Sequence, residues 1–220
     1  MIKTDKGFVQ LYKIYGRSET EIKEILSDIL NKNGNISIYT RTHANEVHVL
    51  AELVEQDEET AKNTLKPVAK EIKKALGTMV YSTKEHETME EAVVRLLNKY
   101  ELTVTTAESC TGGMIASKIV NVPGASDVFN EGFITYSNKA KRKHLDVSKN
   151  TLKKYGAVSE QTVKEMALGG VFAADSDACI AVSGIAGPDG GTDEKPVGLV
   201  YIGCCDVLPV DGGYGGVGSF

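Results

Sequence analysis

The chain has 220 residues, 41% of them hydrophobic and 25% charged, which is typical of a globular protein with one large or two small domains. Its net charge of −5 argues against a broad surface for nucleic-acid backbones. No apolar run is long enough to span a membrane, and the N-terminal residues show no secretory or transit signal, so we expect a cytoplasmic protein. The four cysteines lack metal-finger spacing, so we expect reduced thiols.

The first 82 residues predict a small α+β domain. In order, the pattern predicts strand 8–15, a helix from Ser18 to Asn33-Gly34, strands 35–40 and 46–54 joined by a turn at 42–45, a helix over 57–77, and a short strand 78–82. Ser18-Glu-Thr-Glu21 has the spacing of a helix capping box, and Pro67 is expected to kink or restart the second helix. The apolar stripe of the first helix should contain Ile22, Ile25, Leu26, Ile29 and Leu30. The order β-α-β-β-α-β is compatible with helices on one face of a mixed sheet.

This first domain carries no recognisable chemistry. His43 and His48 have no carboxylate or cysteine at ligand spacing, so a metal site is not expected there. Some small RNA-binding modules share the topology, but their Gly-x-x-Gly clamp loop is absent. A spacer or dimerisation role is therefore favoured over nucleic-acid binding.

The second domain, residues 83–220, predicts an alternation of helices and strands. After the charged connector 84–88 we expect a helix capped at Thr88, strand 102–106, helix 114–120, strand 128–136, a basic helix through Lys143, helices 148–155 and 159–174, strand 177–183 and strand 196–204. The first of these helices should bury Met89, Val93, Leu96, Leu97 and Tyr100. This order is typical of an α/β layer protein, whose ligands bind beyond the carboxyl ends of the strands.

Three polar loops follow strand ends in this domain, at 108–113, 136–141 and 183–191. Because such loops lie at the same edge of a parallel sheet, we expect them to converge on one site. They supply the hydroxyl of Ser109, two lysines and many backbone N–H groups, but no histidine. That combination suits acyl transfer or amide hydrolysis through a serine and a lysine.

A second reading of the same residues is structural. Serine and threonine are common helix N-caps, and Gly112-Gly113 is ordinary turn chemistry. Residues 139–143 could simply be the solvated face of a basic helix. From these residues alone, both readings stay open.

The ordered motifs of the second domain resemble those of a known family. Ala107-Glu-Ser-Cys-Thr-Gly-Gly113, Gly132-Phe-Ile-Thr-Tyr-Ser-Asn138 with Lys141, Gly156-Ala-Val-Ser159 and Ser183-Gly-Ile-Ala-Gly-Pro-Asp-Gly-Gly191 with Lys195-Pro-Val-Gly198 look like the C-terminal domain of the CinA family, the competence/damage-inducible proteins. The resemblance implies hydrolysis of nicotinamide mononucleotide to nicotinate mononucleotide and ammonia, without a metal or other cofactor. Residues 1–82 resemble the KH-like middle domain of longer members. The activity of those members' N-terminal pyrophosphatase domain is not carried over.

The resemblance also implies residue roles. Ser109 would be the nucleophile and Lys141 the base, with Tyr136 orienting or relaying the proton and Lys139 the weaker candidate for the base. A lysine can accept a proton near neutral pH only if its surroundings lower its pKa from about 10.4. The N–H groups of Thr111, Gly112 and Gly113 would hold the oxyanion or the substrate phosphate, but not both. The full set of residues expected to contact the substrate is Glu108, Thr111, Gly112, Gly113, Ser137, Asn138, Ser183, Gly184, Gly187 and Gly191.

The sequence departs from this pattern after about residue 205. Members of the family usually continue with another strand, an arginine-containing motif of the site and a closing helix, whereas residues 206–220 are rich in glycine and match none of these. We therefore expect one edge and one face of the second sheet to be uncovered, and a homo-oligomer, such as a dimer, to cover them. The departure also keeps open the alternative of a non-catalytic nucleotide-binding or assembly module.

Overall fold

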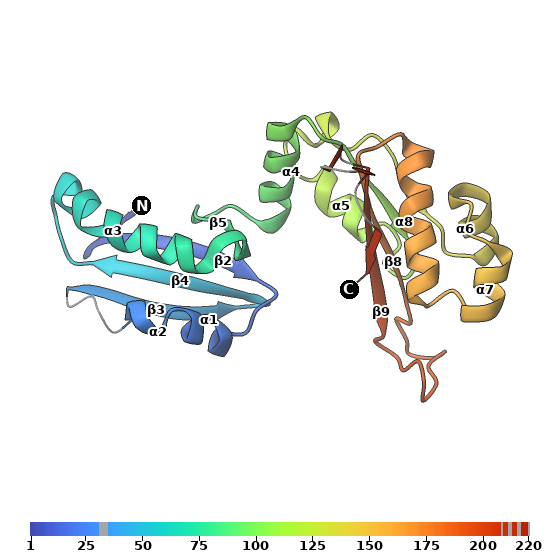
Figure 1. Ribbon diagram of the computed structural model, residues 1–220, viewed down its shortest axis with the longest axis horizontal. Helices are drawn as coiled ribbons and strands as arrows, with labels where there is room; N and C mark the ends of the chain where they lie inside the picture. The colour runs from blue at the N-terminus through green and yellow to red at the C-terminus, as the bar shows by residue number, and fades with distance from the viewer. Residues whose placement is uncertain (31–34, 208, 211–212, 215–216, 220) are drawn as a thin grey trace. The chain divides into compact units, whose positions relative to one another are not determined.

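The chain folds into two compact units, Met1–Ala92 and Val93–Phe220 (Figure 1). The computed structural model describes residues 1–30, 35–207, 209–210, 213–214 and 217–219. The expected helix end at Asn33-Gly34 lies outside these ranges. Within them, no helix is at once long enough and apolar enough to cross a membrane.

The first unit is built on an antiparallel sheet, instead of the expected mixed sheet, with the strand order β1-β2-β4-β3, in which β5 also pairs with β2. Its strands are β1 (Ile2–Thr4), β2 (Gly7–Tyr15), β3 (Ile36–His43), β4 (Glu46–Leu53) and β5 (Val80–Ser82). Alternate residues of β4 are buried, namely Val47, Val49, Ala51 and Leu53. This period of two directs one face of the sheet into the core.

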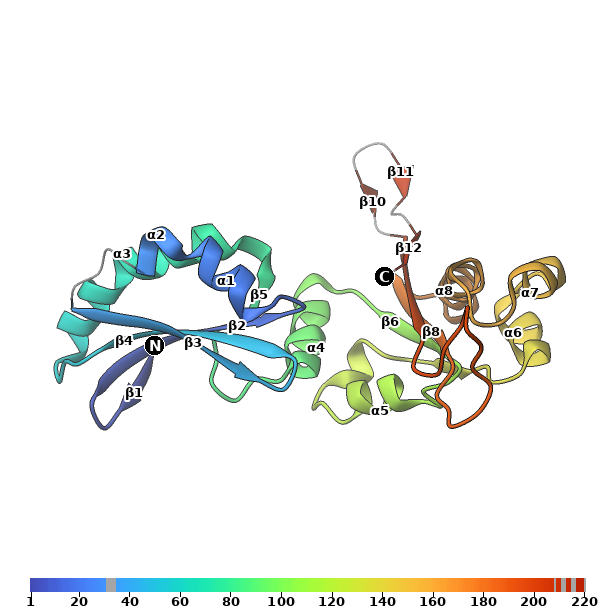
Figure 2. The ribbon, with the colours of Figure 1, turned by 90° about the horizontal axis from the view of Figure 1, so that it is seen from below.

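The helices of the first unit are α1 (Glu19–Ile25), α2 (Ser27–Leu30) and α3 (Glu58–Leu76), and a 3-10 turn (Gly77–Met79) follows α3. Figure 2 shows all three helices on the same face of the sheet, as the sequence predicts. The predicted capping box is confirmed, because the Glu21 N–H donates to Ser18 Oγ at 3.2 Å and the Ser18 N–H donates to Glu21 Oε2 at 2.7 Å. Asp57 caps α3 through the Thr60 N–H.

Three details of the first unit differ from the expectations. The first helix is broken at Leu26 into α1 and α2, so Ile25 falls off the apolar stripe and is 40% exposed. Helix α3 does not restart at Pro67 but continues through it as one element. This proline is exposed, so the carbonyl that it leaves unpaired lies on the solvent side, while Leu65 and Val68 stay buried. The three-residue strand β1 is too short to give a sequence signal.

The connector after β5 is fastened to the first unit. The buried Lys13 of β2 donates its amine to the Glu87 backbone oxygen at 2.8 Å, and the Glu87 carboxylate accepts from Ser82 and pairs with Lys84. The connector is therefore a structured part of the first unit, and the division between the units falls later in the chain than residue 82.

The second unit has a mixed sheet with the order β12-β9-β8-β6-β7. Its strands are β6 (Val104–Glu108), β7 (Gly132–Ile134), β8 (Ala178–Gly184), β9 (Val200–Asp206) and β12 (Val217–Ser219). Strand β6 lies parallel to both β7 and β8, and β9 is antiparallel to β8. The carboxyl ends of β6, β7 and β8 therefore meet at one edge.

Helices cover both faces of this sheet. They are α4 (Met89–Tyr100), whose first four residues are counted with the first unit, α5 (Met114–Val120), α6 (Asn138–Leu145), α7 (Lys149–Tyr155) and α8 (Glu160–Ala174), with a 3-10 turn at Ala125–Asp127. Figure 1 shows α8 between the sheet and α6 and α7, with α5 on the opposite side of the sheet. One core forms under α8 and another around Val94, Val104 and Ile119. The layered α/β fold predicted for this unit is confirmed.

Two adjacent glycines allow α8 to pack closely on both sides. A Cβ built on Gly169 would lie 1.9 Å from the backbone oxygen of Leu145 in α6, and one on Gly170 would lie 2.5 Å from the sulfur of Cys179 in β8. No larger side chain fits at either position without a shift of its neighbours. These contacts fix how near α6 comes to the sheet.

In the second unit, the bounds of two predicted strands and the buried face of one predicted helix differ from the structure. Strand β7 covers three residues instead of nine, because residues 125–129 form a 3-10 turn and its exit. Helix α4 buries Ala92 and Val94, whereas Leu96 and Tyr100 of the predicted stripe are 38% and 59% exposed. The last predicted strand starts at Val200, because residues 196–199 belong to the preceding loop.

The chain after residue 206 contains β10 (Pro209–Val210), β11 (Gly213–Tyr214) and β12. Strand β12 pairs with β9, with Val217 opposite Cys205 and Ser219 opposite Gly203. The expectation that this edge of the sheet stays unpaired is therefore wrong. The neighbouring face does remain open, since Val200 and Ile202 on β9 are 42% and 43% exposed.

Candidate active site

Ser109 lies directly after β6, at the start of the turn that leads into α5. Its N–H donates to the Val182 oxygen of β8 at 2.9 Å, and the Thr135 N–H donates to the oxygen of Glu108 at 2.8 Å. These bonds extend the parallel pairing by one residue on each side. The serine is thereby held between two neighbouring strand ends, with only 7% of its surface exposed.

The preceding residue, Glu108, fixes the shape of the turn. Its carboxylate is fully buried and accepts hydrogen bonds from the N–H groups of Gly113, Ile115 and Ala116 at 2.8–3.1 Å. Burial acts to raise the Glu108 pKa, but the Thr111 hydroxyl and these three N–H groups outweigh it, and the net pKa is lowered. Glu108 was expected to contact the substrate; its carboxylate instead caps α5.

Lys141 comes to the same place from α6. This helix starts at Ser137, whose hydroxyl accepts from the Ala140 N–H at 3.1 Å, and it points Lys141 inward one turn later. The Lys141 Nζ donates to Ser109 Oγ at 2.8 Å, to the Thr135 oxygen at 2.7 Å and to the Tyr136 oxygen at 3.4 Å. Lys141 is completely buried, and these three oxygens provide one acceptor for each hydrogen of the charged amine.

Burial has a clear effect on this amine. Loss of hydration lowers the Lys141 pKa to about 8, with a smaller opposing effect from the Cys110 thiol. Lys139, two residues earlier on α6, is exposed and does not contribute to this shift, so burial rather than a second lysine lowers the Lys141 pKa. A substantial fraction of Lys141 is therefore uncharged in mildly alkaline solution.

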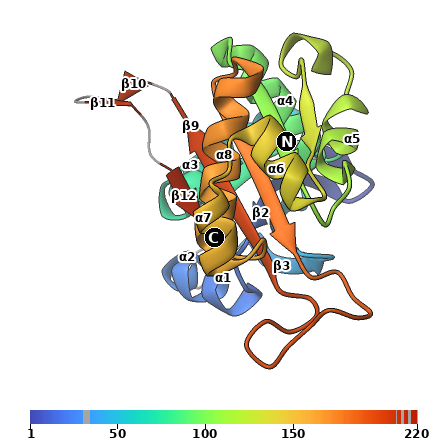
Figure 3. The ribbon, with the colours of Figure 1, turned by 90° about the vertical axis from the view of Figure 1, so that its right-hand side faces the viewer.

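A cavity of about 300 Å³ opens in front of the serine. Its wall is formed by the three loops expected to converge, together with residues 157–158. The lining residues are Ser109, Cys110, Tyr136, Ala157, Val158, Ser183, Gly184, Ile185, Ala186, Gly187, Asp189 and Gly190. Figure 3 shows the long loop between β8 and β9 extending past the ends of these strands. Lys141 lies behind Ser109, outside the lining.

The other residues expected in the site have mixed positions. Ser183 and Gly184 line the cavity at the end of β8, and Ser183 Oγ donates to the Ala157 oxygen at 2.8 Å. Gly187 also lines it, whereas Gly191 packs against Val197 outside the lining. The Tyr136 phenol is 76% exposed at the rim, and it is the backbone oxygen of this residue that meets Lys141.

The expected N–H donors are largely engaged within the turn. The Gly112 N–H donates to the Ser109 oxygen at 3.2 Å, and the Gly113 N–H donates to Glu108. Among the described residues, no oxygen accepts a hydrogen bond from the N–H groups of Cys110 or Thr111. Burial raises the Cys110 thiol pKa, and these two N–H groups, with the Lys141 amine, act against that rise. Ser137 serves as the α6 N-cap, and Asn138, at its first helical position, is exposed outside the lining.

Comparison with known proteins shows the family to which the chain belongs. Residues 86–208, more than half of the chain, match the model of the CinA C-terminal domain, and residues 10–82 match that of the damage-inducible protein CinA KH domain. The chain belongs to the CinA family. A CinA-like protein of Kosmotoga olearia is 46% identical over 196 residues, which are 89% of this chain and 47% of the relative. The chain thus spans about half the length of the curated relatives it matches.

Solved CinA structures resemble this chain as well. A competence/damage inducible protein, CihA, from Agrobacterium tumefaciens is 41% identical, with a TM-score of 0.54 over 59% of this chain and 76% of that one. A CinA superfamily protein from Escherichia coli is 34% identical, with a TM-score of 0.54 over 66% and 84%. The predicted family is therefore confirmed.

Several residues of this CinA cavity were not predicted from the sequence. Ala157 and Val158 belong to the motif Gly156-Ala-Val-Ser159, which the resemblance singled out without giving it a role. Asp189 lies in the glycine-rich loop motif, where only glycines and Ser183 were expected to contact the substrate, and Lys195, outside the lining, donates to the oxygen of Val158. Cys110 carries no signal of its own, because a lone cysteine beside a serine is usually a small apolar residue. Their place in the family motifs is the sequence signal that links these residues to the site.

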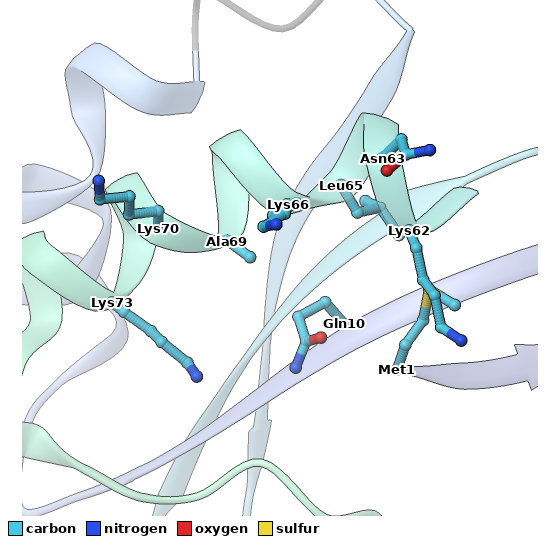
Figure 4. Close-up of a pocket in the computed structure, with 9 residues that line it drawn as sticks. All are labelled: Met1, Gln10, Lys62, Asn63, Leu65, Lys66, Ala69, Lys70 and Lys73. Carbon is cyan, nitrogen blue, oxygen red and sulfur yellow. The ribbon is translucent and has the colours of Figure 1, made fainter. Parts of the chain in front are cut away.

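The CinA chain has a larger hollow on the first unit, of about 620 Å³, between α3 and β2. Figure 4 shows Gln10 of β2 beneath the helix, with Lys62 and Lys73 reaching down on either side of it. Lys66 and Lys70 complete its basic rim. Its lining contains no hydroxyl or thiol nucleophile and no carboxylate, so this hollow lacks the serine-type groups for acyl transfer. In the described ranges, no three His, Cys, Asp or Glu side chains are grouped so that they could hold a metal ion.

Proposed function

We propose that this chain is an amidohydrolase that converts nicotinamide mononucleotide to nicotinate mononucleotide and ammonia. The observation that carries the proposal is the 2.8 Å contact between Ser109 Oγ, in the wall of a cavity, and the buried Lys141 Nζ behind it. A hydroxyl is a weak nucleophile until a base takes its proton, and an amine with a pKa near 8 can do so close to neutral pH. The choice of nucleotide rests on the family resemblance.

The contacts of Lys141 suggest how the amine is aimed. When the amine is neutral, its two hydrogens can donate to the oxygens of Thr135 and Tyr136, which leaves the lone pair directed at the Ser109 hydroxyl. The serine proton then passes to Lys141 as Oγ bonds to the carboxamide carbon of the substrate. The tetrahedral oxyanion would be held by the N–H groups of Cys110 and Thr111, which have no other oxygen acceptor among the described residues.

The reaction is completed in two steps. The protonated Lys141 gives its proton to the departing nitrogen, so the C–N bond breaks, ammonia leaves and an ester of Ser109 remains. A water molecule then loses a proton to Lys141 and attacks the ester, and Lys141 returns that proton to Ser109 Oγ as the carboxylic acid departs. The acid ionises, and ammonia takes up its proton. The sum is one amide and one water converted to one carboxylate and one ammonium ion.

The test is ammonia release from nicotinamide mononucleotide by the purified chain and by the Ser109→Ala variant. We expect the variant to lose at least about 10³-fold in kcat, because removal of a serine nucleophile disables the whole relay. An alanine variant that keeps the full rate would exclude Ser109 as the nucleophile. Binding of the nucleotide without any turnover by the unaltered chain would favour the alternative, a non-catalytic nucleotide-binding module.

We also propose that the chain acts in the cytoplasm as a homo-oligomer. The support is the open face of β9, where Val200 and Ile202 present adjacent apolar side chains to solvent. Light scattering on the purified chain would give its mass, and a monomer at micromolar concentration would contradict this assembly.

A further inference from the structure

We infer that Asp189 makes the cavity selective for a cationic, N1-substituted pyridinium ring over a neutral pyridine carboxamide. This inference rests on the proposed function, since it concerns the ring whose carboxamide would reach Ser109. It assigns a specificity-determining role to a residue of the β8–β9 loop that faces the same cavity as the nucleophile.

The charges around the cavity are the first argument. Among its lining residues, Asp189 is the one that carries a formal charge near neutral pH; the others are apolar, glycine, or bear a hydroxyl, phenol or thiol. Two lysines lie beside the cavity without belonging to its lining. Lys141 lies behind Ser109, and the proposed reaction requires its neutral form, while the Lys195 amine donates to the oxygens of Tyr155 and Val158. The cavity therefore has a negative character that no lining cation balances.

The Asp189 carboxylate is also unengaged. Within the described part of the chain, it makes no hydrogen bond or ion pair with another residue. The potential partner in its own loop, Lys195, donates its amine to the oxygens of Tyr155 and Val158 at 2.7 Å each. A bound cation would thus meet a carboxylate that is not already neutralised.

The loop that carries Asp189 is held in place on both sides. A Cβ on Gly187 would lie 2.6 Å from Val197 Cγ1, and one on Gly191 would lie 2.8 Å from the Val197 nitrogen, so the two arms of the loop pack directly together. Lys195 ties this loop to the segment after α7, where Ala157 and Val158 also line the cavity. Asp189 is exposed to solvent, and it is carried by a loop whose two arms pack against each other beside the cavity.

The chemistry of the ring supplies the selectivity. Alkylation or ribosylation of the ring nitrogen gives a permanent positive charge, whereas free nicotinamide is neutral near pH 7. With the carboxamide carbon at Ser109, the ring must occupy the 300 Å³ cavity, within a few ångströms of its walls. An opposite charge at that range favours the cation even when solvent screens part of the interaction. The same carboxylate repels a phosphate group, which would point away from this loop.

The experiment compares N1-methylnicotinamide with nicotinamide, two ligands that lack ribose and phosphate and differ chiefly in charge. Each is tested as an inhibitor of nicotinamide mononucleotide hydrolysis and, independently of turnover, by calorimetric titration of the Ser109→Ala chain. We expect the cation to bind about tenfold more tightly, equivalent to about 1.4 kcal/mol. In Asp189→Asn the preference should fall to about twofold or less.

Asp193→Asn is the matched control, because Asp193 is an exposed carboxylate of the same loop outside the cavity lining. It should keep the full preference. The inference is wrong if Asp189→Asn also keeps the preference for the cation. It is also wrong if the unaltered chain hydrolyses the nucleotide but shows no such preference, and in both cases the proposed function stands. If the chain binds the cation selectively through Asp189 but releases no ammonia, the proposed function fails and the charge recognition stands.

Discussion

The buried amine of Lys141 is the residue on which the chemistry of this chain depends. An exposed lysine keeps its proton far above neutral pH, and this one differs because it has lost its hydration while retaining two carbonyl partners. Lys139, two residues earlier, is exposed on α6 and meets neither condition. The helix phase of α6 therefore distinguishes the two lysines that the sequence left open.

The pH dependence of kcat/KM should report this amine. Lys141 acts as a base only when uncharged, so the rate should rise with pH and reach half of its maximum near pH 8, where burial places its pKa. Initial rates of ammonia release between pH 6 and 10 would measure the curve. Lys139→Ala should leave it unchanged. A rate that keeps rising beyond pH 10 would mean that the base is an ordinary solvated lysine.

Glu108 should contribute mainly to stability. In Glu108→Gln the negative charge is lost and one amide hydrogen faces a group of N–H donors, so α5 loses much of its cap. We expect the free energy of unfolding to fall by about 1–3 kcal/mol in denaturant titrations. Glu131→Gln, at an exposed position of the same unit, should change it by less than about 0.5 kcal/mol. Equal effects of the two substitutions would contradict the capping role.

At the scale of elements, local signals predicted most of the fold. Ser18 and Asp57 in the first unit, and Ser159 in the second, cap helices where the spacing indicates them. The wrong predictions concern segments whose structure is determined by tertiary packing and not by the local sequence. The apolar residues at 128–129 read as the beginning of a strand, but they belong to the exit of a 3-10 turn that packs against α5. Continuation of α3 through Pro67 likewise depends on the sheet beneath it.

The close approach of α6 and α8 should be sensitive to one methyl group. In Gly169→Ala the new Cβ would overlap the Leu145 backbone oxygen, and α6 must shift or α8 must bend to admit it. We expect a loss of about 1–3 kcal/mol in the free energy of unfolding, together with a lower kcat, because α6 carries Lys141. Lys164→Ala, at a partly exposed position of the same helix, serves as the control. A fully active and stable Gly169→Ala would mean that α6 is positioned by other contacts.

At the scale of the whole molecule, the sequence predicted two folding units, and each has its own core. The core of the first unit draws only on residues before 81. What the sequence did not reveal is where that unit ends, since residues 84–88 look like a solvated charged linker. Only the fold brings Glu87 next to Lys13, which lies 74 residues earlier in the chain.

Two fragments test this ending. We expect residues 1–88 alone to unfold in a single cooperative thermal transition, followed by circular dichroism, because the core of the unit is complete. Residues 1–82 should be less stable by about 1–3 kcal/mol, since the buried Lys13 amine then lacks its carbonyl partner. Equal stability of the two fragments would show that the connector adds nothing to the unit.

The complete burial of Lys141 also sets its reactivity toward reagents that modify amines. Acylating probes label lysines that they can touch, and the Nζ of this residue offers no surface from outside and stands behind Ser109 as seen from the cavity. In the intact chain, Lys139 and Lys143 on the same helix should be labelled while Lys141 is spared. Peptide mapping of the labelled protein would measure how slowly Lys141 is modified, and any labelling of this residue would report transient opening between α6 and the sheet.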